Sequence, residues 1–414
     1  MNAQTPLVSS DLPHFITRHP VLDKKDHVLG FELSWHAHLQ PENSEEDEAH
    51  DERLLKYAVE LGHQRAFDGK LTFVSISQRT LFSPQVEHLP KERVVLALHQ
   101  TDALNPDVIA RAEALERLGF VLAVNEVADR DVPNHLLGAC HYVRLDTTQF
   151  DVVSLAERAE ELRRGPLRDH QLMATHVDTP EVYETCEKLG FDLFQGYYFT
   201  RIEPTKPSRV DASVLRVSDI LNKIAARAEF DELEAGFKLD PALSYKLLRY
   251  INSPAIGLRS TIKSIGHALT MLGYDQTYRW LTLLLFSSAH TSARNLVLLR
   301  NALARAHFTE TLGHDRMGVN ERGGLFIVGM FSLLDALLNI PMSKALADLN
   351  LPSTVADALI HGDGPYAPYL KLVIACEHAD QETLAALAKD IDMNPLAVNQ
   401  AHVTALVWSE SVDV

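Results

Sequence analysis

Short β-rich runs alternate with helical stretches through the first half of the chain, and this alternation limits the folds open to it. The runs span 71–76, 93–98, 120–124, 142–145 and 171–177. Helical patterns fill the intervals at 52–67, 106–118, 152–163 and 180–189. Continuous apolar strands separated by helices are typical of a parallel sheet covered on both faces. The number of units predicts an α/β barrel of the TIM type.

The pattern changes after residue 200. Pro204 and Pro207 stand among charged residues, as in a linker. Beyond them the β-rich runs disappear, and apolar residues recur at spacings of three and four, which predicts helices that face a core. Asp240 and Pro241 mark a helix start, because aspartate caps free backbone N–H groups and proline fits the first turn. We therefore expect a barrel over 1–203, a linker over 204–210 and an all-α domain over 211–414.

Composition narrows the classes of partner. The 414 residues carry a formal net charge of -17, which opposes unassisted binding to nucleic acid or to an anionic membrane. A protein or a small ligand is the expected partner. Cys140, Cys186 and Cys376 are far apart in the sequence and form no paired motif, which favours a reducing compartment. No signal peptide and no apolar run of about 18 residues is visible, so we expect a cytoplasmic protein.

Polar residues stand at the ends of the expected strands, where β/α-barrel enzymes carry their catalytic groups. These candidate site residues are Glu32, Ser75, Gln100, Asn125, Glu126, Arg144, Asp146, Asp178 and Gln195. The sequence around Glu32 reads Gly-Phe-Glu-Leu-Ser, and residues 190–199 read Gly-Phe-Asp-Leu-Phe-Gln-Gly-Tyr-Tyr-Phe. Both segments resemble the EAL domain, at its first motif and at its closing signature. The resemblance implies the barrel of a cyclic di-GMP phosphodiesterase, whose reaction depends on divalent cations.

The chain departs from this family pattern at several strand ends. Ser75 stands where the family has asparagine, and 97–100 stands where it has two glutamates. Asn125 and Thr175 replace acidic residues. Arg144 replaces the catalytic lysine and is no equivalent base, because a guanidinium stays protonated. The acids that remain at motif positions are Glu32, Glu126, Asp146 and Asp178. These departures predict a protein that is not an enzyme and holds no metal or cofactor, although a lone cation between Glu32 and Asp146 stays an alternative.

The second half resembles the HDOD domain, a helical relative of the HD phosphohydrolases without their metal ligands. The matching positions are Asp240, Pro241, Leu248, Asn252, Ser253, Gly273, Ser332 and Asp335. Ser332 and Leu333 stand where an active relative has its His-Asp pair. His314-Asp315 is such a pair, but it lies in a polar, turn-like stretch. We interpret Asp335 as a structural carboxylate and Gly273 as the end of a helix.

Taken together, the two halves resemble the bacterial EAL–HDOD signal transduction proteins of the YuxH-like type. The leading interpretation is a non-catalytic regulator in cyclic di-GMP-linked pathways such as motility, biofilm formation or stress responses. Its partners would be other signalling proteins, and the resemblance is compatible with a homodimer. One alternative is a receptor that binds cyclic di-GMP through Glu32, Arg144, Asp146 and Gln195 without hydrolysis. Another alternative is a residual phosphodiesterase.

Overall fold

The computed structural model describes residues 15–35, 51–52, 54–56, 70–99, 105–126, 134–164, 170–202, 212–253, 256, 262–288, 293–378 and 381–412. The chain divides into two compact units. One consists of Met1–Arg201 with Lys371–Asp413, and the other of Ile202–Leu370 with Val414. The C-terminal segment from Lys371 thus groups with the N-terminal unit. The expected linker at 204–210 lies outside the described residues, and that division stays a prediction.

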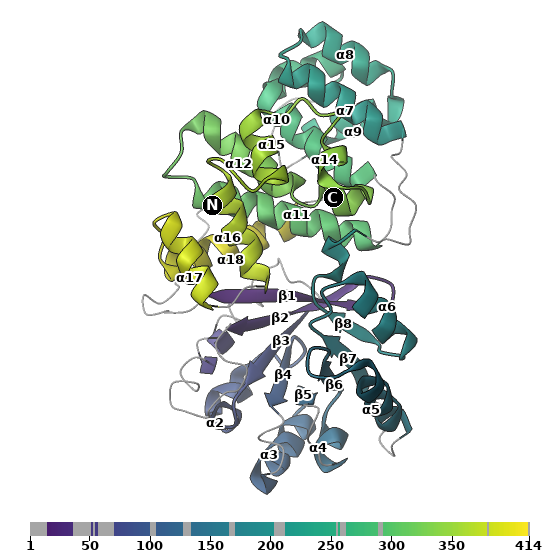
Figure 1. Cartoon of the computed structure of the whole chain (residues 1–414), viewed down its shortest axis with the longest axis vertical. Helices are drawn as coiled ribbons and strands as arrows, with labels where there is room; N and C mark the ends of the chain where they lie inside the picture. The colour runs from purple at the N-terminus through teal and green to yellow at the C-terminus, as the bar shows by residue number, and fades with distance from the viewer. Residues whose placement is uncertain are drawn as a thin grey trace. The chain divides into compact units, whose positions relative to one another are not determined.

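The N-terminal unit is built around a closed barrel in the order β1-β2-β3-β4-β5-β6-β7-β8 (Figure 1). The strands are β1 Ile16–Asp23, β2 Val28–Trp35, β3 Leu71–Ile76, β4 Val94–His99, β5 Val121–Glu126, β6 Tyr142–Asp146, β7 Gln171–Thr175 and β8 Leu193–Gln195. Strand β1 runs antiparallel to both of its neighbours, and every other pairing is parallel. The predicted barrel is confirmed, and the carboxyl ends of β2 to β8 all open on one side of it.

Helices follow most of the strands, as the alternation predicted. They are α2 Gln78–Leu81, η2 Pro84–His88, α3 Pro106–Arg117, α4 Asn134–Ala139, α5 Val152–Arg164, α6 Pro180–Lys188 and η4 Tyr198–Thr200. Polar side chains set several of the helix starts. Asn105 Oδ1 accepts from the N–H of Asp107 at the start of α3, and Thr179 Oγ1 accepts from the N–H of Val182 in α6. The helix expected at 52–67 lies largely outside the described residues.

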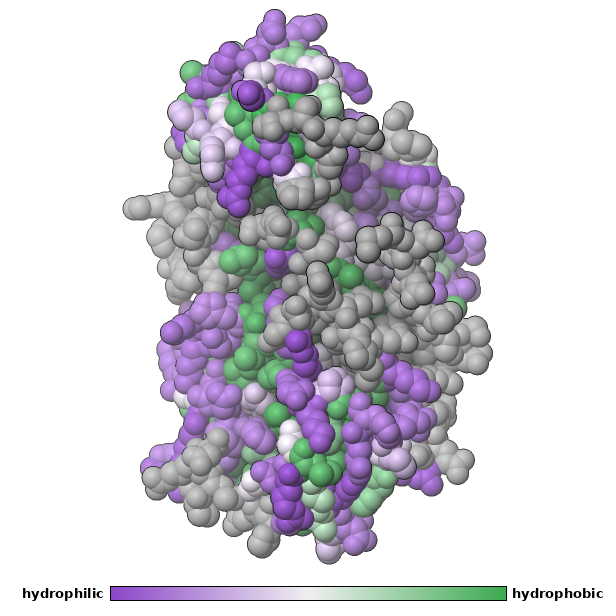
Figure 2. All heavy atoms as spheres, turned by 180° about the vertical axis from the view of Figure 1, so that it is seen from behind, coloured by the Kyte–Doolittle hydropathy of each residue, from purple (hydrophilic) through white to green (hydrophobic). Residues whose placement is uncertain are grey.

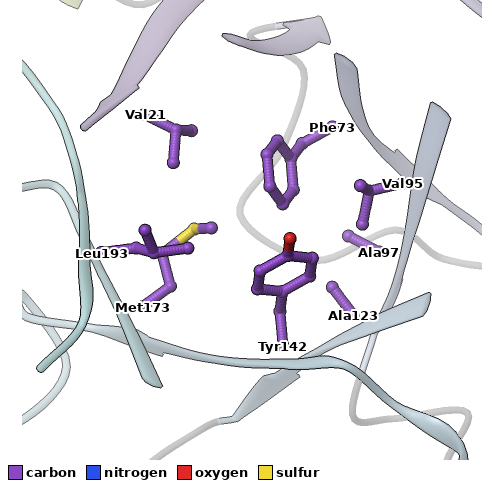
Figure 3. Close-up of a cluster of buried hydrophobic side chains, with 8 residues drawn as sticks. All are labelled: Val21, Phe73, Val95, Ala97, Ala123, Tyr142, Met173 and Leu193. Carbon is purple, nitrogen blue, oxygen red and sulfur yellow. The ribbon is translucent and has the colours of Figure 1, made fainter. Parts of the chain in front are cut away.

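Apolar side chains fill the inside of the barrel (Figure 3). The cluster consists of Val21, Phe73, Val95, Ala97, Ala123, Tyr142, Met173 and Leu193. Side chains alternate between the two faces of a strand, so each strand sends every second residue into this space. Phe73 and Tyr142 meet edge to face, with ring centroids 5.3 Å apart. We call this cluster the apolar floor.

The remainder of the chain is helical. Its helices are α7 Ala212–Ala225, α8 Phe230–Lys238, α9 Pro241–Ile251, α10 Ile265–Ser288, α11 Ala293–Leu312, α12 Val319–Phe331, α13 Leu334–Leu338, α14 Met342–Ala345, α15 Ser353–Ile360, α16 Ala367–His378, α17 Gln381–Asp390 and α18 Pro395–Ser411. Asp240 caps α9 as predicted, with Oδ1 accepting from the N–H of Leu243 at 3.0 Å. Gly273 ends a helix, as predicted. Its φ of 70° and ψ of -179° are not helical, and a second helix begins directly after it, so α10 consists of two helices that meet at this glycine.

Hydrophilic side chains cover much of the described surface in the view of Figure 2, in keeping with a chain in which 23% of the residues are charged. The three cysteines are buried, and none of them forms a disulfide. None of the helices in the described ranges combines the length and apolar character that crossing a bilayer requires.

Candidate functional site

A layer of polar side chains lies directly above the apolar floor. In β3, β5, β6, β7 and β8, the residue two positions beyond the floor residue is polar and points into the barrel. Strand β1 runs in the opposite direction, so its polar residue, His19, lies two positions before Val21. His19 is the register partner of Glu32 in β2. The members of this polar layer are His19, Glu32, Ser75, Asn125, Arg144, Thr175 and Gln195. The layer faces the carboxyl ends of the parallel strands, which is the end where barrel enzymes bind their ligands.

An ion pair forms the centre of the polar layer. Arg144 Nη2 donates to Glu32 Oε1 at 2.5 Å, and both side chains are buried, with exposed fractions of 5% and 9%. Arg144 Nη1 also reaches Ser75 Oγ at 3.4 Å. Burial alone would raise the pKa of Glu32, but the charges of Arg144 and His19 and the hydrogen bond from Arg144 lower it further than burial raises it. Glu32 is therefore held as a carboxylate whose charge is balanced inside the protein.

Two polar atoms beside this pair lack partners. Asn125 Oδ1 and Arg144 Nε are buried and make no hydrogen bond to any residue in the described part of the chain. The two residues are register partners on β5 and β6, so both groups lie in the same part of the layer. Buried donors and acceptors are nearly always paired in proteins, and leaving one unpaired costs about 1–3 kcal/mol. The layer thus retains hydrogen-bonding capacity that the described part of the chain does not use.

A second acidic residue holds a histidine at the edge of the layer. Asp146, the last residue of β6, lies with Oδ1 3.0 Å from Nδ1 of His176, just after β7. The N–H and hydroxyl of Thr148 also donate to Asp146 Oδ1, at 2.9 and 2.7 Å. Burial would raise the pKa of Asp146, but the hydrogen bond and charge of His176 and the bonds from Thr148 lower it. The hydrogen bond to Asp146 raises the pKa of His176 in turn.

The segments that follow β7 and β8 approach each other closely at one point. A Cβ on Gly196 would lie 2.3 Å from the carbonyl oxygen of Val177, and its φ is 147°. Only glycine fits there without displacing backbone. Next to it, the N–H of Tyr197 donates to Asp178 Oδ1 at 2.9 Å. The backbone N–H of His176 donates to Gln195 Oε1 at 2.9 Å. These bonds set the spacing between the ends of the two strands.

The structure brings most of the predicted barrel residues to one place. Arg144 contacts both Glu32 and Ser75, and Asn125 and Gln195 belong to the same layer. Asp146 and Asp178 lie at the rim. Gln100 lies outside the described residues, and of Glu126 only the backbone position in β5 is described.

Sequence reasoning missed His19 and His176. The alternation along β1 places His19 on the same face as Val21, and that signal could have identified it. Nothing in the sequence indicated that His176 would meet Asp146, because the two side chains come from neighbouring strands 30 residues apart.

The described residues do not fit a divalent cation. The Glu32 carboxylate is already paired with Arg144, and that of Asp146 with His176 and Thr148. Across the described ranges, no group of three His, Cys, Asp or Glu side chains is placed to hold a metal ion. A hard cation needs several oxygen ligands that are not already neutralised.

The predicted residues of the helical half have structural contacts. Asn252 ties α9 to the segment before α10, because Ile262 N–H donates to its Oδ1 at 2.7 Å and its Nδ2 donates to Ile262 O at 2.8 Å. Ser332 ends α12 and accepts from Nη1 of the buried Arg305 at 3.0 Å. Asp335 Oδ1 accepts from the N–H of Ala336 in the first turn of α13. Leu248 is half-buried, and Pro241 and Ser253 stand at the two ends of α9.

Comparison with known proteins adds four findings. Residues 211–340 match the family model of the HDOD domain. Protein YuxH of Bacillus subtilis (strain 168) is 25% identical over 412 residues, which cover 96% of this chain and 98% of YuxH. The protein of Vibrio cholerae named cyclic di-GMP phosphodiesterase CdgJ is 25% identical over 406 residues, which cover 96% of this chain and 93% of CdgJ. Among solved structures, the FimX EAL domain from Pseudomonas aeruginosa bound to c-di-GMP has a TM-score of 0.35 at 17% identity, covering 45% of this chain and 89% of that one.

The comparison with CdgJ corrects one prediction. We expected from the replaced carboxylates that this chain is not an enzyme. A relative that aligns with nearly its whole length is named a phosphodiesterase, and this finding contradicts that expectation. Counting replaced positions against a family pattern was a poor guide, because relatives that differ at three quarters of their positions can rearrange the groups around a site. The N-terminal part of the chain forms a closed barrel, residues 211–340 match the HDOD domain, and two relatives align with nearly its whole length, so the chain is similar to EAL–HDOD proteins.

Proposed function

We propose that the barrel binds cyclic di-GMP at the polar layer and that the chain acts in cyclic di-GMP signalling. The observation that carries the proposal is the polar layer itself, which lies at the carboxyl end of a closed barrel. A cyclic dinucleotide offers two phosphodiesters and two guanine edges, which need donors and acceptors in one compact site. Arg144 Nε and Asn125 Oδ1 are a buried donor and a buried acceptor without partners in the described structure.

The charges around the layer favour this ligand in spite of the net charge of the whole chain. Glu32 is balanced by Arg144, and Asp146 faces His176. An approaching phosphodiester therefore meets no uncompensated carboxylate among these four groups. Charges this close are screened little by salt, so the local balance outweighs the distant surface acids.

Hydrolysis of cyclic di-GMP is the second candidate function. The name of CdgJ supports it. The test is product formation: the chain is incubated with cyclic di-GMP and magnesium or manganese, and the linear dinucleotide is quantified by chromatography. Steady accumulation of that product supports hydrolysis, and an intact dinucleotide at high enzyme concentration argues against it.

We further propose that the HDOD domain transmits the signal by binding other signalling proteins, as its family resemblance implies. Affinity capture with the full chain, with and without cyclic di-GMP, tests this. A partner retained only in one of the two conditions supports signalling through binding.

The site of binding is tested by hydrogen–deuterium exchange with and without cyclic di-GMP. We expect slower exchange in the strand ends that carry the polar layer, at 32–35, 144–148, 175–178 and 195–198. Peptides from α3 and α5, on the outside of the barrel, provide the internal control. Protection confined to those outer helices, or to the helical half, would contradict the proposed location.

A further inference from the structure

His176 has a backbone conformation that disfavours its side chain. Its φ is 58°, in the left-handed region, where a residue with a Cβ is strained. The surrounding structure holds it there: its N–H donates to Gln195 Oε1, and its C=O accepts from Thr147 Oγ1 at 3.1 Å. Glycine would make the same backbone bonds without the strain. A strained non-glycine residue at a site is a reason to ask what its side chain does.

Within the described ranges, the imidazole of His176 is held through one of its two nitrogens, Nδ1. Nδ1 lies 3.0 Å from Asp146 Oδ1, and Asp146 is itself fixed by Thr148 and by Gln149 Nε2 at 3.1 Å. Nε2, on the part of the ring away from that carboxylate, bonds to no residue in the described ranges, and 44% of the side chain is exposed. The arrangement is that of a ring held in one orientation by a carboxylate so that its second nitrogen meets a ligand.

The neighbouring cation, the guanidinium of Arg144, already donates hydrogen bonds within the polar layer. Arg144 donates to Glu32 and Ser75, so its terminal nitrogens are bound within the layer. The charged groups that act on His176 are Asp146 from β6, Glu32 from β2 and Asp178 after β7. All three are acidic and raise the pKa of His176, which favours the protonated ring, and a protonated ring offers an Nε2–H donor and a positive charge to an anionic ligand.

We propose that His176 is a ligand-contacting residue, which hydrogen-bonds through Nε2 to a phosphodiester oxygen of the bound dinucleotide while Asp146 orients its ring. This inference rests on the proposed function, because it names a contact within the same site.

The experiment compares cyclic di-GMP titrations of the full wild-type chain with those of H176N and H176G. Asparagine tolerates the left-handed backbone and glycine relieves it, so both variants should remain folded, as circular dichroism at the temperature of the titration can check. Both should weaken binding about tenfold or more, the typical effect of losing a charge-assisted hydrogen bond. Added imidazole should restore binding to H176G, where the ring leaves space beside Asp146, and should not restore binding to H176N.

The matched control is R227G. Arg227 also has a left-handed backbone, with a φ of 53°, but it lies in the helical half, after α7. Its replacement should leave the affinity unchanged. Wild-type binding together with unchanged affinity in both His176 variants would overturn the inference and leave the proposed function standing. Absence of binding by the folded wild-type chain would overturn the proposed function and this contact with it.

Discussion

At the scale of single residues, the Glu32–Arg144 pair places two opposite charges in the interior of the barrel. Both ions have left water, and each would be costly to bury alone. Their attraction and the contact with Ser75 offset that cost. The pair also explains why Glu32 remains ionised in an interior position.

Replacing one member of this pair should lower the free energy of unfolding more than replacing both. We expect R144L to lower the free energy of unfolding by about 3–5 kcal/mol, because it leaves the Glu32 carboxylate buried without a partner. The double variant E32L/R144L should be the more stable of the two. Urea denaturation followed by circular dichroism measures both. A loss below about 1 kcal/mol in R144L would contradict the pairing.

The Asp146–His176 pair predicts a pH dependence of stability. The pKa of His176 is raised above its usual 6.5, so its stabilisation is complete below pH 6.5 and is lost as the pH rises through the raised value. The pKa of Asp146 is lowered below 3.8, so its stabilisation is present above pH 3.8 and is lost as the pH falls through the lowered value. The pair therefore contributes most between these limits. The thermal midpoints of unfolding of wild type and H176N, measured across pH 4–9, should converge at alkaline pH. A difference between the midpoints that stays constant with pH would count against the pair.

At the scale of elements, the close approach of the segments that follow β7 and β8 depends on Gly196. We expect G196A to lower the free energy of unfolding by at least about 2 kcal/mol, because the added Cβ meets the backbone of Val177 and the φ is unsuitable. G119A is the control, since its φ is 90° but no heavy atom lies within 4 Å of the added Cβ. It should lose only about 1 kcal/mol. Equal losses in the two variants would show that the contact with Val177 has no effect.

Helix α9 offers a test of capping. Asp240 accepts from the N–H of Leu243 and pairs with Arg216. We expect D240A to lower the free energy of unfolding by about 1 kcal/mol. E229A is the matched change, because Glu229 holds the same position before α8 without a side-chain cap bond. Guanidinium denaturation measures the free energy of unfolding of both variants. If E229A lowers it as much as D240A does, the capping role of Asp240 is refuted.

The elements could be predicted because their signals are local. Strand β3 has the predicted limits, and β4 to β7 differ by at most two residues. Strand β8 has three residues, too few for a pattern, and emerged only from the closing signature. The period of two along each strand could place side chains in the barrel. It could not show that Arg144 pairs with Glu32, because that contact joins residues 112 positions apart and depends on how the barrel closes.

At the scale of the whole molecule, the chain keeps a closed barrel whose interior changes from apolar to polar over one layer of side chains. The apolar floor supplies packing, and the polar layer above it supplies unused hydrogen-bonding groups. The C-terminal segment from Lys371 groups with this unit, although it follows the HDOD match in the sequence. Sequence order alone did not indicate this, because helices carry no signal of which core they join.

The most direct test of the account is a calorimetric titration of the full-length chain with cyclic di-GMP. We predict saturable heat with one site per chain and a dissociation constant in the micromolar range or below, at which a drug-sized ligand is bound with about 8 kcal/mol. GTP at the same concentration should give little heat, because it lacks the second guanine and the cyclic phosphodiesters. A flat trace with protein shown to be folded by circular dichroism would contradict binding at the polar layer.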